Sequence, residues 1–135
     1  MMRCQLDRKG QEIVEYALVL PILLLLVFGI IDFGVTVFVY NSIANAAREG
    51  ARTGVVIPFD ENDDTAAEQT VSNAVVNRTG WLNLDADEDI TVTRTVTRTQ
   101  VEVVYEHRLL TGPIIQVVAG GPEIQLRSVA TMHNE

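Results

Sequence analysis

The sequence predicts an α+β protein in which one long N-terminal helix carries a small C-terminal domain. The first observation is an apolar stretch from Tyr16 to Tyr40 that contains one charged residue, Asp32. The second is a set of alternating apolar and polar residues in three later segments, which is typical of β-strands. The chain has 135 residues, so about eighty remain beyond residue 56 for a small domain. We therefore predict a helix over 11–56 and an α+β domain over 57–135.

The apolar stretch is long enough to cross a membrane. A helix over it would be about 37 Å long, against a bilayer core of about 30 Å. The segment from Leu20 to Phe28 is apolar on every side, which disfavours a soluble core helix. A cleaved secretory signal peptide is the alternative, because Ala44-Asn45-Ala46 resembles its cleavage pattern. The apolar run is longer than the 7–15 residues of such signals, so we predict a single transmembrane helix spanning about 16–40.

The flanking charges predict the orientation of this helix. Arg3, Arg8 and Lys9 precede the apolar stretch, and acidic residues dominate after it. Basic flanks stay in the cytoplasm, which places the N-terminus inside and the C-terminal domain outside. The net charge of −8 argues against a nucleic-acid partner, because such binding needs a basic surface.

The helix is expected to continue beyond Tyr40 with one face made of small residues. Ala46, Gly50 and Gly54 recur every four residues, and Ala47 and Ala51 fall in the same sector. Small side chains allow another element to approach closely. Two interpretations stay open at this point. The face could seat the chain's own C-terminal domain, or it could contact a partner protein.

The domain that follows is expected to contain one helix and three strands in an antiparallel meander. After a loop at 57–64, a helix is predicted from Thr65 to Thr79, with Thr65 as its cap, Glu68 completing a capping box and Gly80 ending it. The alternation predicts strands at 90–98, 101–105 and 124–132. A shift in apolar parity places the first turn between strands near Arg98-Thr99-Gln100.

The start of the apolar stretch resembles a known processing site. Gly10 is followed five residues later by Glu15 and then Tyr16. This G-x-x-x-x-E-Y pattern is similar to the site at which a prepilin peptidase cuts pilins of the tight-adherence (Tad) pilus. The resemblance implies a cut between Gly10 and Gln11, which would make residues 1–10 a cytoplasmic leader peptide.

A second resemblance lies further along the helix. The runs Phe28-Gly29-Ile30-Ile31-Asp32-Phe33-Gly34 and Ala46-Ala47-Arg48-Glu49-Gly50-Ala51-Arg52 resemble the TadE-like domain of minor Tad pilins. The resemblance covers about a third of the chain. It implies a pilin-like fold and a minor pilin, or pseudopilin, that helps to initiate or regulate pilus assembly for adherence. Its implied partners are the membrane, the prepilin peptidase, other minor pilins and the Tad assembly platform.

The resemblance also implies roles and a location for the N-terminal residues. Glu15 and Tyr16 would act in assembly, with the Glu15 carboxylate pairing with the α-ammonium group that cleavage creates at Gln11. The protein would lie in the bacterial cytoplasmic membrane as a single-pass protein, or in the pilus. The alternative function is an unprocessed, single-span, membrane-anchored surface binding module, and the mature N-terminus distinguishes the two.

We find no pattern that predicts enzymatic chemistry. The acidic run Asp85-Ala86-Asp87-Glu88-Asp89 invites a calcium interpretation, but an EF-hand loop needs glycine at its sixth position and glutamate at its twelfth. Ile90 and Val96 occupy those positions. His107 and His133 have no second ligand at metal spacing. We therefore expect no enzyme, no metal, no cofactor and no small-molecule substrate.

Overall fold

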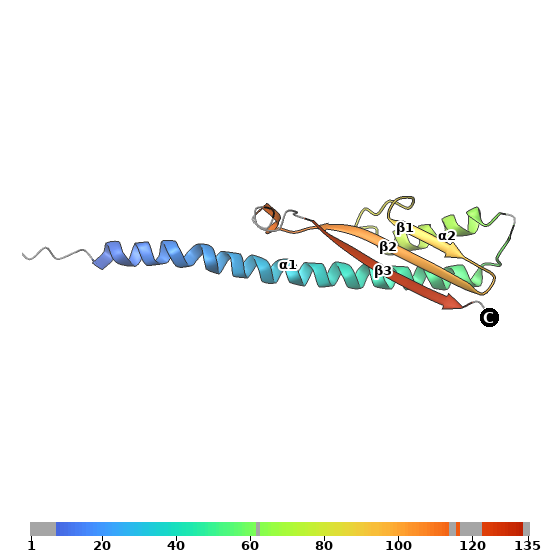
Figure 1. Cartoon of the computed structure of the whole chain (residues 1–135), viewed down its shortest axis with the longest axis horizontal. Helices are drawn as coiled ribbons and strands as arrows, with labels where there is room; N and C mark the ends of the chain where they lie inside the picture. Colours follow the sequence, from blue (N-terminus) through green and yellow to red (C-terminus); the bar gives the residue numbers. More distant parts are fainter. Residues whose placement is uncertain (1–7, 62, 114–115, 117–122, 134–135) are drawn as a thin grey trace, which may run out of the picture.

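The computed structural model describes residues 8–61, 63–113, 116 and 123–133. It contains α1 (Arg8–Val56), α2 (Thr65–Arg78), β1 (Ile90–Arg94), β2 (Arg98–Arg108) and β3 (Glu123–His133). We call the part of the chain from residue 57 onward the head. The head lies along the C-terminal part of α1, and the N-terminal part of α1 extends far beyond it (Figure 1). The predicted α+β fold class is confirmed.

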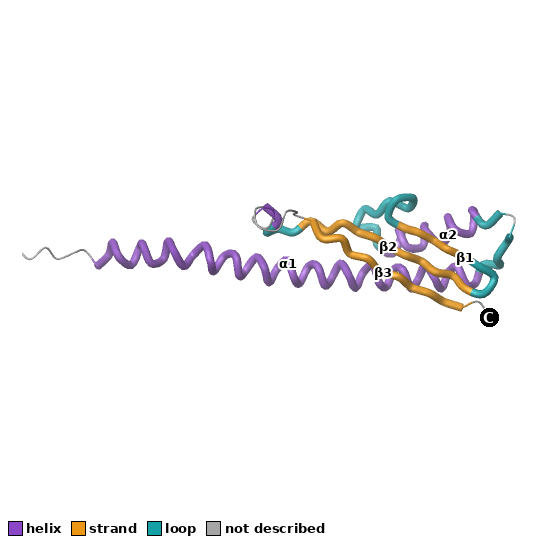
Figure 2. The backbone as a smooth tube through the Cα atoms, viewed as in Figure 1, coloured by secondary structure: helices purple, strands orange, loops and turns teal. Residues whose placement is uncertain are grey.

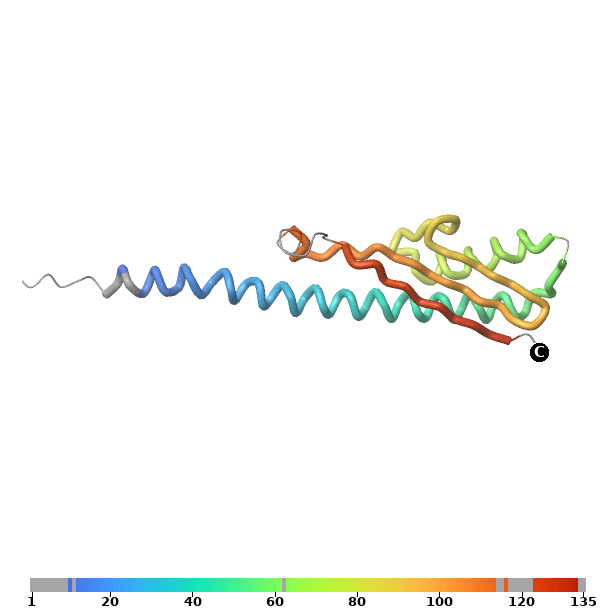
Figure 3. The backbone as a smooth tube through the Cα atoms, viewed as in Figure 1, coloured from blue at the N-terminus to red at the C-terminus, as the bar shows by residue number. Residues whose placement is uncertain are grey.

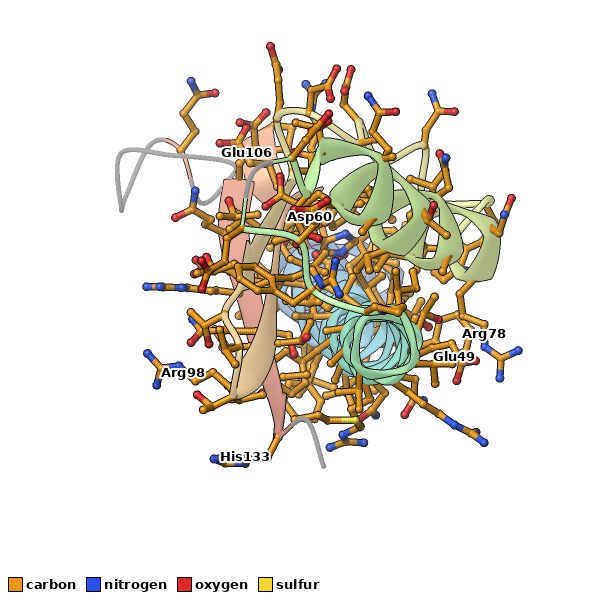
Figure 4. All side chains as sticks on the ribbon, turned by 90° about the vertical axis from the view of Figure 1, so that its right-hand side faces the viewer. Glu49, Asp60, Arg78, Arg98, Glu106 and His133 are labelled. Atoms are coloured by element: carbon orange, nitrogen blue, oxygen red, sulfur yellow. The ribbon has the colours of Figure 1, made fainter. Side chains whose placement is uncertain are left out.

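The three strands form one antiparallel sheet in the order β1-β2-β3. The register pairs Ile90 with Val103 and Val101 with Ala130. Figure 2 shows the strands running obliquely along α1. Viewed along α1, the sheet forms one layer and the two helices lie together on one side of it (Figure 4). The head is thus a two-layer structure, with α1 supplying part of the second layer.

The hydrophobic core lies where α1, α2 and the sheet meet. Alternate residues of β2 face the helices, and Val101 and Val103 are fully buried. From α2 come Val71 and Val75, which are also fully buried. The residues of α1 in this core are Val39, Ile43, Ala46, Ala47 and Ala51. Full burial of one valine or isoleucine side chain stabilises a fold by about 1.5–3 kcal/mol, so the head depends on α1 for much of its stability.

The turn between β1 and β2 differs from the sequence prediction. It was expected near Arg98-Thr99-Gln100, but β1 ends at Arg94 and β2 begins at Arg98. The Thr95 amide donates to the carbonyl of Arg98 at 2.9 Å and closes the turn. Val96 lies in this turn and is exposed. The prediction was wrong because the alternation counted Val96 as a strand residue.

The predicted capping box of α2 is also wrong. The N-cap position is Asp64, and its side chain makes no capping hydrogen bond. Thr65 is the first helical residue, and its hydroxyl and amide both donate to Asp63 Oδ1, at 2.5 Å and 3.2 Å. These hydrogen bonds, the hydroxyl one first, hold the pKa of the Asp63 carboxyl below its ordinary value. The helix ends at Arg78, one residue before the predicted end and shortly before Gly80.

The N-terminal part of α1 is exposed along its described length. Every described side chain from Glu12 to Ile31 is exposed, and Figure 3 shows this segment projecting away from the sheet. Pro21 lies within the helix without ending it. By length and composition, α1 is able to cross a membrane. Burial against the head begins at Asp32.

Candidate functional site

The predicted processing residues lie on the free end of α1. Gly10 is helical and exposed, and a Cβ built on it would meet nothing within 4 Å among the described residues. Glu15 and Tyr16 are exposed on the following turns. The Gln11 side chain lies outside the described residues. The structure therefore groups these positions at one end of the helix, separate from Ala46, Gly50 and Gly54.

Asp32, the one charged residue of the apolar stretch, joins this helix to the head. Its carboxylate accepts hydrogen bonds from the Leu110 amide at 2.8 Å, the Thr111 amide at 2.8 Å and the Thr111 hydroxyl at 2.5 Å. These donors belong to a turn closed by the Gly112 amide and the carbonyl of Leu109. We call Leu109–Gly112 the base turn. Asp32 is 7% exposed, so an acid that would be costly in an apolar span is paired within the chain.

The small-residue face lies against the chain's own α2 and β2. We use this name for Ala46, Ala47, Gly50, Ala51 and Gly54. A Cβ on Gly50 would come within 2.6 Å of Val75 Cγ2, and one on Gly54 within 2.5 Å of Thr99 Cγ2. Real Cβ atoms essentially never approach so closely. Of the two open interpretations, the structure therefore places the close approach within the chain.

A buried arginine holds the other end of the head. The Arg94 guanidinium of β1 donates to the carbonyl oxygens of Gly54 at 3.0 Å and Ile57 at 2.6 Å. It also forms an ion pair with Asp64, with Nη1 and Oδ1 at 2.5 Å. The last turn of α1 has no basic residue, so Arg94 supplies the cation that complements the carboxyl end of a helix. One side chain thus connects α1, the residue before α2, and β1.

Sequence reasoning assigned no role to Asp32 or Arg94. Asp32 carried a signal, because a lone acid in an apolar helix needs a partner. Arg94 carried a weaker one, since it continues the inward alternation of Ile90 and Val92, both of which pack toward the core. Asp32 bonds to Thr111, 79 residues away, and Arg94 bonds to Gly54, 40 residues away. A local sequence pattern cannot identify partners at such separations.

The acidic run before β1 is held by its own backbone. The Asp85 amide donates to Asp89 Oδ2 at 2.8 Å, and the Asp87 amide donates to Asp85 Oδ1 at 3.0 Å. Within the described ranges, no group of three histidine, cysteine or acidic side chains is arranged to hold a metal ion. Two of these carboxylates thus already serve the turn that leads into the sheet.

These features define a protein with one apolar helix long enough to cross a membrane and a head built on the continuation of that helix. Residues 10–52 match the model of the family described as TadE-like protein. No curated protein and no solved structure matches the chain. The matched segment contains Gly10, Asp32 and most of the small-residue face. The resemblance to the TadE-like family is confirmed for this segment, which is most of α1.

Proposed function

We propose that the chain is a TadE-like minor pilin, or pseudopilin, of a tight-adherence pilus or secretion system. It would be held in the cytoplasmic membrane by α1, with its N-terminus in the cytoplasm and its head outside. A prepilin peptidase would remove residues 1–10. The processed protein would act with other minor pilins and the assembly platform to initiate or regulate pilus assembly, and so support adherence.

The main support is the position of Gly10. The family match begins at this residue, and the peptide bond after it is the proposed cleavage site. Glycine within a helix costs roughly 1 kcal/mol relative to alanine, yet a Cβ on Gly10 would meet no described atom within 4 Å. The fold therefore does not require glycine here. A peptidase with a narrow active site, in contrast, would require a residue without a side chain before the bond that it cuts.

The placement of the head supports a low-copy role. Along the second half of α1, the small-residue face is covered by α2 and β2. That half of the helix therefore offers less of its surface to neighbouring subunits than a bare helix would. A subunit with such a head would crowd a filament built from short helical pilins. Initiation or regulation of assembly fits this shape better than the role of the major subunit.

Glu15 fits the proposed assembly role by its position. Cleavage would create an α-ammonium group at Gln11, four residues before Glu15 on the same helix. A carboxylate at the edge of an apolar span is costly unless it is paired. The exposed Glu15 is therefore available to an ammonium group of its own chain or of a neighbouring subunit.

Intact-mass measurement of the membrane-extracted protein tests the proposal. Cells that contain the peptidase should yield a chain that begins at Gln11, and cells without it should yield the full chain. The Gly10→Leu variant should accumulate as precursor. Gly29→Leu is the matched control, because a Cβ there also meets nothing described within 4 Å, and it should be processed normally.

The same measurement decides the alternative. A full-length chain in cells that contain an active peptidase would contradict the pilin proposal and favour an unprocessed surface binding module. The head offers one place for a ligand of such a module, a largely polar groove between α2 and β1 that includes Glu68, Gln69 and Asn73. Loss of adherence on deletion of the gene, restored by wild type but not by Gly10→Leu, would favour the pilin.

A further inference from the structure

The length of the exposed part of α1 sets the level at which the head would meet a membrane. The rise along α1 from Glu12 to Asp32 is about 30 Å, and from Glu15 to Asp32 about 26 Å. The hydrocarbon core of a bilayer is about 30 Å thick. With these glutamates at one interface, the core ends at or just beyond Asp32 on the other side. This is also the level at which α1 stops being exposed on all sides and the head begins.

An apolar side chain of the head lies at that level. The Leu110 amide is held by Asp32 Oδ1, which fixes the base turn beside the end of the span. The Leu110 side chain is 66% exposed, unlike the valines of β2 and α2 that form the core of the head. Phe33, one residue after Asp32, is also exposed. The Asp32 carboxylate is turned toward the base turn, where it accepts from the Leu110 and Thr111 amides.

An aromatic pair lies slightly further from the span. The rings of Phe38 and Trp81 have centroids 5.3 Å apart, and the two residues are 60% and 56% exposed. Phe38 is about 9 Å beyond Asp32 along α1, near the outer edge of a headgroup layer that is about 5–7 Å thick and begins at or just beyond Asp32. Tyr40 is exposed close by. Tryptophan and tyrosine are enriched at this depth in membrane proteins.

We propose that the head is seated in the lipid leaflet on its own side, with Leu110 at the acyl boundary and Trp81 and Phe38 among the headgroups. We call Leu110, Phe38, Tyr40 and Trp81 the basal surface. We assign lipid as the partner of this surface because the surface begins at the level along α1 where the apolar span ends. It also combines residues of α1 with residues of two separate segments of the head, the loop after α2 and the base turn. The inference does not depend on the pilus assignment.

The chain has a single tryptophan, so Trp81 reports directly on this contact. The full chain is reconstituted at high lipid excess into phosphatidylcholine vesicles with bromine on the acyl chains. Trp81 fluorescence should be quenched by lipids brominated near the headgroup and shielded from iodide. In the Trp81→Phe background, Leu110→Trp should be quenched more strongly by lipids brominated deeper in the chains.

Val56→Trp in the same background is the matched control. Val56 is 78% exposed at the far end of the head, so its tryptophan should be quenched by iodide several-fold more than Trp81 and should not respond to brominated lipid. If Trp81 behaves like this control, the proposal is overturned. It is also overturned if Trp81 is shielded from iodide without lipid quenching and the shielding disappears on dilution with lipid, since a second copy would then cover the surface.

Discussion

The Asp32 carboxylate accepts hydrogen bonds from both the amide and the hydroxyl of Thr111, which lies 79 residues later in the chain. Asp32 is the first buried residue after the exposed part of α1. Thr111 lies in the connection from β2 to β3. The pair closes the head onto α1 at the end of the head nearest the exposed part of this helix. It also gives a function within the fold to the single acid of the apolar stretch.

Asp32→Asn should loosen this closure. The new amide group would face the Leu110 and Thr111 amides with one acceptor in place of two. Hydrogen bonds to charged groups contribute about 1.5–3 kcal/mol each, so we expect a loss of about 2–3 kcal/mol in the unfolding free energy of the detergent-solubilised chain. Trypsin should cut faster after Arg108, which directly precedes the base turn.

Thr111→Val is the matched control for the Asp32 prediction. It removes the hydroxyl donor and leaves both amide donors in place, so the loss should be about 1.5 kcal/mol, the low end for one hydrogen bond to a charged group. Thr36→Ala removes only a hydroxyl that donates to the Asp32 carbonyl and should leave trypsin cleavage after Arg108 unchanged. Equal cleavage in Asp32→Asn and wild type would show that the carboxylate does not hold the turn.

Arg94→Met should destabilise the far end of the head. The Arg94 side chain is 1% exposed and that of Asp64 12%, so the substitution leaves a largely buried carboxylate without its cation. Breaking such a pair costs about 3 kcal/mol or more, which thermal unfolding should detect. Amide hydrogen exchange should also rise over residues 55–60, because the carbonyl oxygens of Gly54 and Ile57 lose their donor.

The double variant Arg94→Met with Asp64→Leu separates charge from packing. In the described part of the chain, Arg94 Nε and Asp64 Oδ2 are buried without a hydrogen-bond partner, so apolar replacements remove unsatisfied groups. The double variant should be more stable than Arg94→Met alone. If it is less stable than Arg94→Met, the unpaired Asp64 carboxylate is not the cause of the destabilisation.

Gly50→Ala should destabilise the head although alanine favours helix. The helical gain is roughly 1 kcal/mol, but the new Cβ would meet Val75 Cγ2 at 2.6 Å. Overpacking of this kind costs about 1–3 kcal/mol, so the net change should be unfavourable, and Gly50→Leu should be worse. Gly34→Ala is the control, since its Cβ meets nothing described within 4 Å. Equal melting temperatures for Gly50→Ala and Gly34→Ala would exclude close packing of the head against Gly50.

Glu15→Ala tests the proposed assembly role without touching the head. Glu15 is exposed and far from the core, so membrane insertion, cleavage after Gly10 and head stability should match wild type. Assembly should fall sharply, because the α-ammonium group at Gln11 would lose its carboxylate partner. Counting pili and measuring adherence in a strain that carries only the variant checks this. Normal piliation would exclude the role.

The element types were predictable because their patterns are local. A long apolar run defines the free half of α1, small residues every four positions define its covered face, and alternation defines the strands. The three strands were placed within a few residues of their observed ends. Errors occurred where one side chain departs from the local pattern, as with the exposed Val96 in the turn and Asp63 at the start of α2.

The two attachments of the head were not predictable in the same way. Asp32 and Arg94 both depart from their local pattern, one as an acid in an apolar run and one as a base on an inward strand position. Each anomaly indicates that a partner exists but not which residue it is. The partner of Asp32 depends on where the connection after β2 returns to α1, and that depends on the whole length of the sheet.

The attachments at Asp32 and Arg94 have a mechanical consequence. They lie at opposite ends of the head, about 33 Å apart along α1, and the core packing lies between them. A force that pulls the head along the helix axis therefore acts in shear on both attachments and the core together. Such a force does not break the two attachments one after the other. A force applied to the head is therefore transmitted to the apolar part of α1 through the whole interface at once.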